Sequence, residues 1–223
     1  MASLTVENYV KEIHRITTAA EGRPATTGQI AAALGVAPGT VTSMLKTLDA
    51  ARLATHRPYE GVALTKAGRI LALRVIRRHR LLELFLHRTL DMSWDEVHDE
   101  AEHMEHAVSD LLVDRIDAFL GHPLVDPHGD PIPAADGAAE GERWSPIPSL
   151  AECPAGARFR LARVLDQSAG FLRSLTDSGL TLGAEGEVER NPDGAGLMRV
   201  RLSGGRSLAL ALGAAEKLLV APG

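Results

Sequence analysis

The stretch TTGQIAAALGVAPGTVTSMLKTLDAARL, residues 26–53, decides how the N-terminal part of the chain folds. Thr26 or Thr27 can cap a helix, and the apolar residues that follow have helical spacing up to a tight turn at residues 35–37. Pro38 then suits the first turn of a second helix, where its missing N–H would have no partner anyway. The pattern predicts a helix-turn-helix packed through Ile30, Leu34, Val36, Val41, Leu45 and Leu48.

The flanking segments extend this motif in both directions. Apolar residues at helical spacing predict a first helix over residues 6–20. After the motif, residues 54–64 contain two short extended runs around a turn, which is typical of a β-hairpin wing. Thr65 can then cap a long helix over residues 66–90. A winged helix-turn-helix is therefore expected.

The second helix of the motif would enter the major groove of DNA. Its exposed side carries mostly small residues, which can contact thymine methyl groups and phosphates but lack the bidentate readout of arginine or asparagine. Part of any specificity would then come from DNA shape. A helical hairpin that binds no nucleic acid is the alternative. The candidate DNA-contacting residues are Thr27, Pro38, Gly39, Thr40, Thr42, Ser43 and Lys46, with Arg57 and Tyr59 from the wing.

The formal charge of −5 hides a strong asymmetry along the chain. Residues 1–80 carry 12 basic and 5 acidic residues, whereas residues 81–150 carry 3 and 16. A basic N-terminal segment suits a polyanion, because neutralising phosphates releases counterions. An acidic middle segment suits a cation.

Potential metal ligands recur at offsets of zero, four, seven and eight within residues 98–106, which places them on one face of a predicted helix. About twenty residues upstream, His79 and Glu83 repeat the i, i+4 spacing on the long helix. Carboxylates with imidazoles and no thiolate suit a borderline or hard divalent ion, and paired glutamates favour Mn(II) or Fe(II). An acidic, histidine-rich surface helix is the alternative. The ligands of this face are His98, Glu102, Glu105 and His106.

The C-terminal part of the chain has turn and strand patterns in place of helical ones. Residues 121–149 are rich in Gly, Pro, Asp and Ala and are expected to form a linker with turns. Beyond them, ARFRLARVL, GEVER, LMRVRLS and SLALAL are strand-like runs, and SAGFLRSLTDSGL is a short helix. These runs predict a small β-barrel.

Composition limits where the protein can be located and whether it can span a membrane or form a disulfide. The chain is 45% hydrophobic, contains no apolar stretch long enough to span a membrane, and begins without the features of a signal peptide. Its single Cys153 cannot form an internal disulfide. A cytoplasmic location is expected, with no membrane and no organic substrate as a partner.

Four motifs in this order and spacing resemble the diphtheria-toxin-repressor family of metal-dependent transcriptional regulators: the helix-turn-helix, RHRLLE at 78–83, VHDEAEHMEH at 97–106 and DPHGDPIP at 126–133. The resemblance covers essentially the whole chain. It implies a mainly α fold, a homodimer and a palindromic operator. The implied domains are a winged helix-turn-helix at 1–72, a helical metal-binding and dimerisation domain at 73–140, a linker at 141–149, and an SH3-like barrel of the FeoA type at 150–223.

The resemblance also implies two metal sites. In the family's manganese regulators a glutamate stands where iron-type members have cysteine, and Glu102 follows the manganese pattern. Lys11 departs from both patterns, because it stands where manganese regulators have a second acid and cannot bind a metal. The primary site would use Glu102, Glu105 and His106 with Asn8 from the first helix. The ancillary site would use His79, Glu83 and His98 with Asp166, or Gln167, from the barrel.

The resulting hypothesis is DNA binding gated by Mn(II) or Fe(II), with repression of metal-uptake genes when metal is bound. A bound ion can shift the orientation of the DNA-binding domain only by its differential affinity for the two orientations. One alternative is a winged-helix regulator that answers an organic ligand. Another is a metal-dependent hydrolase, although no separate nucleophile or base is evident. An enzyme is therefore not expected.

Overall fold

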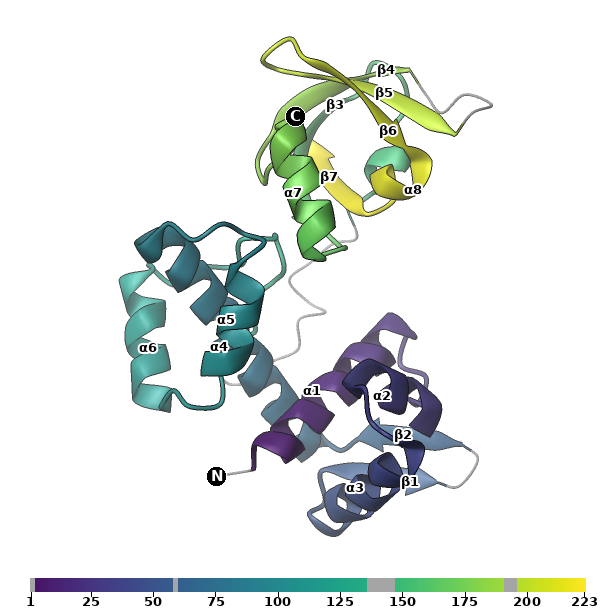
Figure 1. Cartoon of the computed structure of the whole chain (residues 1–223), viewed down its shortest axis with the longest axis vertical. Helices are drawn as coiled ribbons and strands as arrows, with labels where there is room; N and C mark the ends of the chain where they lie inside the picture. Colours follow the sequence, from purple (N-terminus) through teal and green to yellow (C-terminus); the bar gives the residue numbers. More distant parts are fainter. Residues whose placement is uncertain (1–2, 58–59, 136–146, 191–195) are drawn as a thin grey trace. The chain divides into compact units, whose positions relative to one another are not determined.

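The computed structural model of the chain describes residues 3–57, 60–135, 147–190 and 196–223. These residues form two compact units, each described here by itself (Figure 1). Of the described residues, the first unit comprises 3–57, 60–79, 102–113 and 133–135, and the second comprises 80–101, 114–132, 147–190 and 196–223. None of the described helices is long and apolar enough to cross a membrane.

The predicted helix-turn-helix is confirmed. Helix α1 spans Leu4–Ala19, α2 spans Thr27–Leu34 and α3 spans Pro38–Ala50. Thr26 caps α2 in a capping box with Gln29, and the turn after α2 uses Gly35 at a φ of 63°, a left-handed conformation that costs glycine little. Pro38 occupies the first turn of α3, where no N–H is needed.

The wing and the core of this motif also follow the prediction. Strands β1 (Ala54–Arg57) and β2 (Gly61–Leu64) pair antiparallel, and Ala25 adds a bridge to Val62. Among the predicted packing residues, Leu34 and Val36 are partly buried, and the other four are fully buried. The fully buried set is Ile30, Val41, Leu45 and Leu48.

Three helices follow the wing. Helix α4 (Lys66–Leu90) matches the predicted long helix, and α5 (Val97–Met104) and α6 (Asp110–Phe119) come after it. The prediction that one helix carries Glu105 and His106 is wrong, because α5 ends at Met104. The amides of Ala107 and Val108 both donate to the Met104 carbonyl, which closes the helix into a turn. The two ligand candidates therefore lie in that turn.

The expectation that residues 121–149 form a linker is wrong for their first part. Residues 126–129 are buried, and Val125 bridges to Pro131 in a tight turn. The Asp126 carboxylate accepts the amides of His128 and Asp130, which supplies partners for backbone groups that burial would otherwise leave unpaired.

The C-terminal part of the second unit is the predicted small barrel, and Figure 1 shows its curved strands with α7 beside them and α8 after β6. Its sheet is antiparallel with the order β6-β5-β4-β3-β7. The strand β7 at the C-terminal end was not predicted. The barrel elements are η2 (Leu150–Glu152), β3 (Arg158–Val164), α7 (Ala169–Ser178), β4 (Glu185–Arg190), β5 (Leu197–Leu202), β6 (Ser207–Ala211), α8 (Leu212–Ala215) and β7 (Leu218–Pro222).

Alternation along these strands builds the barrel core. Phe159 and Leu161 on β3 face inward with Val188, Met198 and Val200, and all five are at most 1% exposed. The barrel thus has its own hydrophobic core.

Candidate metal centre and DNA-binding surface

Three segments of the first unit bring two predicted primary ligands, Glu102 and Glu105, together with His79, which was predicted for the ancillary site. Helix α4 contributes His79, the end of α5 contributes Glu102, and the turn after α5 contributes Glu105. Ligand atoms of these three side chains all lie within 4.8 Å of one another. Glu105 is fully buried, and its Oε2 lies 2.7 Å from His79 Nδ1. The convergence of buried carboxylate and imidazole matches what a divalent ion requires.

His106 is oriented by a residue that the sequence analysis missed. Its Nδ1 lies 2.8 Å from Oε2 of Glu7, a buried acid of α1, and because a carboxylate accepts, Nδ1 carries the proton. The other ring nitrogen, Nε2, lies 3.1 Å from Glu105 Oε1 and has no hydrogen-bond partner among the described residues. An imidazole nitrogen and a carboxylate oxygen at this separation can share one divalent ion, which sits about 2.0–2.2 Å from each. A carboxylate behind a ligating histidine is also the usual support of such a ligand.

Asn8 presents a second buried acceptor without a partner. Its Oδ1 has no hydrogen bond within the described part of the chain. An amide oxygen is a neutral ligand for a hard or borderline cation. This orphaned atom fits the prediction of Asn8 as the ligand from the first helix.

A cation of the chain itself already binds the two glutamates. Lys11 Nζ donates to Oε1 of Glu102 and to Oε1 of Glu105, both at 2.7 Å. Burial by itself lowers the pKa of Lys11, but the two carboxylates outweigh this effect and raise the pKa above its ordinary value. Burial raises the pKa of Glu105, but the hydrogen bond from His79 and the charge of Lys11 bring it below its ordinary value.

A further ion pair ties Glu7 to α4. Arg78 lies 3.6 Å from the Glu7 carboxylate and 2.8 Å from that of Asp110, and its side chain is mostly buried. Arg78 thus supplies positive charge behind the carboxylate that holds His106.

The predicted ancillary ligands divide between the units, with His79 in the first and Glu83 and His98 in the second. Within the second unit, His98 Nδ1 lies 3.1 Å from Glu83 Oε1. Asp166 binds Lys217 at 2.7 Å, and this bond together with those from Ser168 lowers the pKa of Asp166 to about 2. Asp166 could bind a metal ion only after its ion pair with Lys217 is broken.

The turn at residues 126–130 places two more ligand types beside Glu83. Glu83, Asp126 and His128 are all buried, with ligand atoms within 4.8 Å of one another. Burial and the neighbouring Asp130 and Glu83 carboxylates raise the pKa of Asp126 well above its ordinary value. Gln167, the alternative barrel donor, binds Asp130 at 3.1 Å.

The predicted DNA-contacting side of α3 is open to solvent. Thr27, on α2, is half-buried, and Arg57 in the wing is exposed and pairs with Glu60 at 3.3 Å. Tyr59 lies outside the described residues. The exposed members on α3 are Pro38, Gly39, Thr40, Thr42, Ser43 and Lys46.

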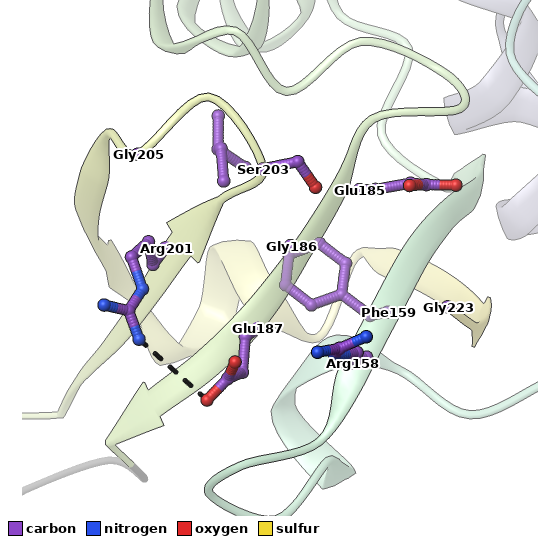
Figure 2. A pocket seen from close by; sticks show the side chains of 10 residues that line it. Arg158, Phe159, Glu185, Gly186, Glu187, Arg201, Ser203, Gly205 and Gly223 are labelled. Atoms are coloured by element: carbon purple, nitrogen blue, oxygen red, sulfur yellow. Dashed lines mark ion pairs between the residues drawn. The ribbon is translucent and has the colours of Figure 1, made fainter.

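The barrel also carries a shallow hollow of about 380 Å³ (Figure 2). Figure 2 shows Arg201 directed at Glu187, with the two charged groups 4.0 Å apart. Arg158 and Phe159 line it as well. None of the predicted metal ligands is among its lining residues.

A winged helix-turn-helix joined to helices that carry clustered acids and histidines defines a DNA-binding regulator with a cation site. Three family models match the chain in order. They are the iron dependent repressor N-terminal DNA binding domain at residues 1–62, the iron dependent repressor metal binding and dimerisation domain at 65–134, and the FeoA domain at 149–222. The chain belongs to the iron-dependent repressor family.

Individual relatives agree with this assignment. The iron-dependent repressor IdeR of Mycobacterium tuberculosis is 29% identical over 199 residues, which cover 85% of this chain and 86% of that protein. The HTH-type transcriptional regulator MntR of Bacillus pumilus is 34% identical over 116 residues, or 52% of this chain and 78% of that one. A solved structure described as a manganese-dependent transcriptional repressor complex with manganese is 38% identical, covers 97% of this chain and 99% of its own, and superposes with a TM-score of 0.85.

This chain is a metal-dependent, DNA-binding transcriptional repressor, and both manganese and iron regulators are among its relatives. The family's helical domain is the one through which its members dimerise.

Proposed function

We propose that the primary site holds one divalent ion, Mn(II) or Fe(II), and that this ion controls operator binding. Glu102, Glu105 and His106 would hold it, with Asn8 from α1 and His79 from α4. The observation that carries this proposal is the buried His106 Nε2, which has no hydrogen-bond partner among the described residues and lies 3.1 Å from Glu105 Oε1, a separation at which both atoms can bind one ion. The bound ion supplies positive charge at a point that side chains from α1, α4 and the turn after α5 share.

Lys11 limits this site to one ion. It donates to the Oε1 atoms of both Glu102 and Glu105, so an oxygen that binds an ion must first release Lys11. A second cation in the same place would also face the ammonium group at close range, where like charges repel strongly. The manganese-type pair of ions is therefore not proposed for this chain.

Coupling to DNA runs through α1. Glu7 and Lys11 link this helix to the turn after α5, and Tyr9, Val10 and Ile13 of the same helix are buried in the core of the winged motif. A change in what Glu105 binds is thus transmitted to the element that supports α3. The size of the effect is set by the difference in metal affinity between DNA-bound and free protein, about 1.4 kcal/mol for each tenfold.

We propose a palindromic operator near metal-uptake genes as the DNA target. A homodimer presents two α3 helices related by a twofold axis, which matches two half-sites. The exposed threonines and serine of α3 favour contacts with thymine methyl groups and phosphates, supplemented by DNA shape.

The test is a mobility-shift titration of chelator-treated protein on the promoter of a metal-transporter gene, with Mn(II), anaerobic Fe(II) or Zn(II). Wild type is compared with Glu105→Gln, which keeps hydrogen-bonding capacity, and with Glu100→Gln, an exposed acid on α5. We expect metal-dependent binding in wild type and Glu100→Gln and loss of the metal response in Glu105→Gln. DNA binding that is unaffected by chelator and by Glu105→Gln would contradict metal gating and favour an organic effector.

A further inference from the structure

The barrel sheet ends in two edge strands, β7 and β6, and within the described residues only the first of these edges is covered. Ser149 bridges to Leu219 on the outer side of β7, and the Val220 amide donates to the Pro148 carbonyl. At the other end of the sheet, β6 pairs with β5 and with no further described strand (Figure 1). An uncovered edge presents backbone groups to which another strand can pair.

The register of the β5–β6 hairpin shows which backbone groups of β6 point away from the sheet. At the turn, the Leu202 amide donates to the Arg206 carbonyl. Hydrogen-bonded pairs recur at every second residue of an antiparallel ladder, so Leu208 and Leu210 are the residues of β6 whose backbone bonds to β5. The residues of β6 that bond outward are Ser207, Ala209 and Ala211.

This outer edge carries none of the devices that usually protect an edge strand. Natural proteins block such edges with lysine, proline, a bulge or a covering segment. The register of β6 with β5 is regular, and in the described part of the chain no group outside the hairpin bonds to the backbone of Ser207 or Ala209. The side chains along the edge are exposed, small and uncharged. The edge is therefore open to another strand.

The edge is complementary to a second copy of itself. In an antiparallel pair centred on Ala209, this residue lies opposite Ala209 of the second copy, and Ser207 lies opposite Ala211. All three residues bond outward, so N–H groups of each copy meet carbonyl groups of the other. No like charges meet across the contact, because none of these side chains is charged.

The same register also pairs apolar side chains on the other face of β6. Leu208 of one copy would lie opposite Leu210 of the other, as a pair without mutual hydrogen bonds, in which side chains approach most closely. Leu208 is only partly buried against the barrel core, and Leu210 is 9% exposed. A second copy would thus cover apolar surface that a single barrel leaves in water, which favours association.

We propose that β6 pairs antiparallel with β6 of a second copy, with the twofold axis at Ala209, and that this contact joins one dimer to another. The family's members dimerise through the helical domain, so β6 is a separate surface. A chain with two different twofold contacts links dimers into a larger assembly. An extended segment of another protein on the same edge is the competing occupant. The proposal does not depend on metal gating.

The experiment is sedimentation velocity of the full chain over a wide range of concentration. Ala209→Lys and Ala209→Glu each place like charges opposite one another on the twofold axis, and both side chains project into solvent from the single barrel. Ser203→Lys is the matched control, because it adds the same charge at an exposed position in the turn beside β6. An equimolar mixture of Ala209→Lys and Ala209→Glu is measured as well.

We expect species larger than a dimer to grow with concentration in wild type and in Ser203→Lys. Ala209→Lys and Ala209→Glu by themselves should weaken this association about tenfold, because like charges meet across the contact. The mixture should restore it, since opposite charges then meet at position 209. Restoration requires a register in which this residue faces its own copy, so a general loss of stability in the variants would not produce it.

A wild-type protein that remains a dimer at every concentration would overturn the proposal. Equal association in Ala209→Lys and Ser203→Lys would overturn it too, as would a mixture that associates no better than its components. Only an edge that serves another protein, or none, is consistent with those results. The thermal midpoint of each variant reports folding. If Ala209→Lys does not fold, Ala209→Pro replaces it, since it removes only an outward N–H, and it should abolish the larger species.

Discussion

Lys11 Nζ lies 2.7 Å from Glu105 Oε1, and the pair joins α1 to the turn after α5 at the centre of the primary site. The same ammonium group lies 2.7 Å from Glu102. A cation of the chain itself therefore binds two of the predicted metal ligands and offsets one of their two negative charges. A divalent ion must displace this ammonium group, so Lys11 lowers the affinity of the site for metal.

Replacing Lys11 with methionine should lower the stability of the metal-free protein and raise its affinity for metal. Removing one partner of a fully buried ion pair costs about 3–5 kcal/mol, and partial exposure of Lys11 and Glu102 reduces this to about 2 kcal/mol. Affinity for Mn(II) should rise about tenfold because the ion no longer displaces an ammonium group. Urea unfolding in chelator and calorimetry with Mn(II) measure the two effects. Lys66→Met, at an exposed lysine of α4, should change neither.

The same pair predicts how the stability of the metal-free protein depends on pH. The pKa of Glu105 is lowered on folding, so its stabilisation is complete above the ordinary glutamate pKa of about 4.3 and disappears as pH falls through the lower folded value. The pKa of Lys11 is raised, so its stabilisation is complete below about 10.4 and disappears as pH rises through the folded value.

Unfolding in urea with chelator, measured from pH 3 to pH 11 in steps of about one unit, checks this expectation. Lys11→Met should flatten the curve on both flanks, whereas Lys66→Met should reproduce wild type. A Lys11→Met curve as steep as that of wild type would show that the pair is not responsible.

Lys46 on α3 should contact a DNA phosphate in the operator complex. Lys46→Ala should weaken binding to all sequences alike and reduce the slope of log affinity against log salt by about 0.9. Fluorescence anisotropy between low and moderate salt measures the slope. Arg88→Ala, an exposed basic residue at the end of α4, provides the control. An unchanged slope for Lys46→Ala would place this lysine outside the interface.

Phe119 at the end of α6 is 69% exposed, and Leu111 on the same helix is exposed to the same degree. The ring of Phe119 packs edge-on to Phe85 with centroids 6.1 Å apart, which leaves its outer side open. Large exposed apolar side chains on a dimerisation domain indicate the interface. Phe119→Asp should weaken the dimer at least tenfold, equivalent to about 1.4 kcal/mol. Sedimentation velocity measures it, and Leu165→Asp on the barrel should leave the dimer intact.

Local sequence signals accounted for most of the fold. Turn residues, caps and apolar spacing located α1 to α4, the wing and four barrel strands, because each signal acts within a few residues. Strand β7 was missed because its short run ends in Pro222, which weakens a strand pattern. The end of α5 was placed too late because the amide pairing at Met104 leaves no mark on apolar spacing.

Spacing along two predicted helices found His79 on the first and Glu102, Glu105 and His106 on the second, but it could not find their partners. Glu7 is 99 residues away from His106 in sequence, so only tertiary contact reveals it. Its position beside Asn8, in the first turn of α1, was the available signal.

Asp126 and His128 were assigned to a linker because Gly and Pro dominate that segment. Such composition marks a turn well, but it does not say whether the turn is buried. In this chain the side-chain carboxylate of Asp126 accepts hydrogen bonds from two backbone amides of the turn, and this permits the turn to be buried.

Gly129 gives this turn one further consequence. Its φ is 84°, and a Cβ added there would overlap the carbonyl oxygen of Ala162 on β3, while Val164 donates its amide to the His128 carbonyl at 2.9 Å. The turn and the first barrel strand thus fit together with no room for a methyl group. Gly129→Ala would therefore force this turn away from β3 by the addition of a single carbon atom, without a change to any acid, histidine or DNA-facing residue.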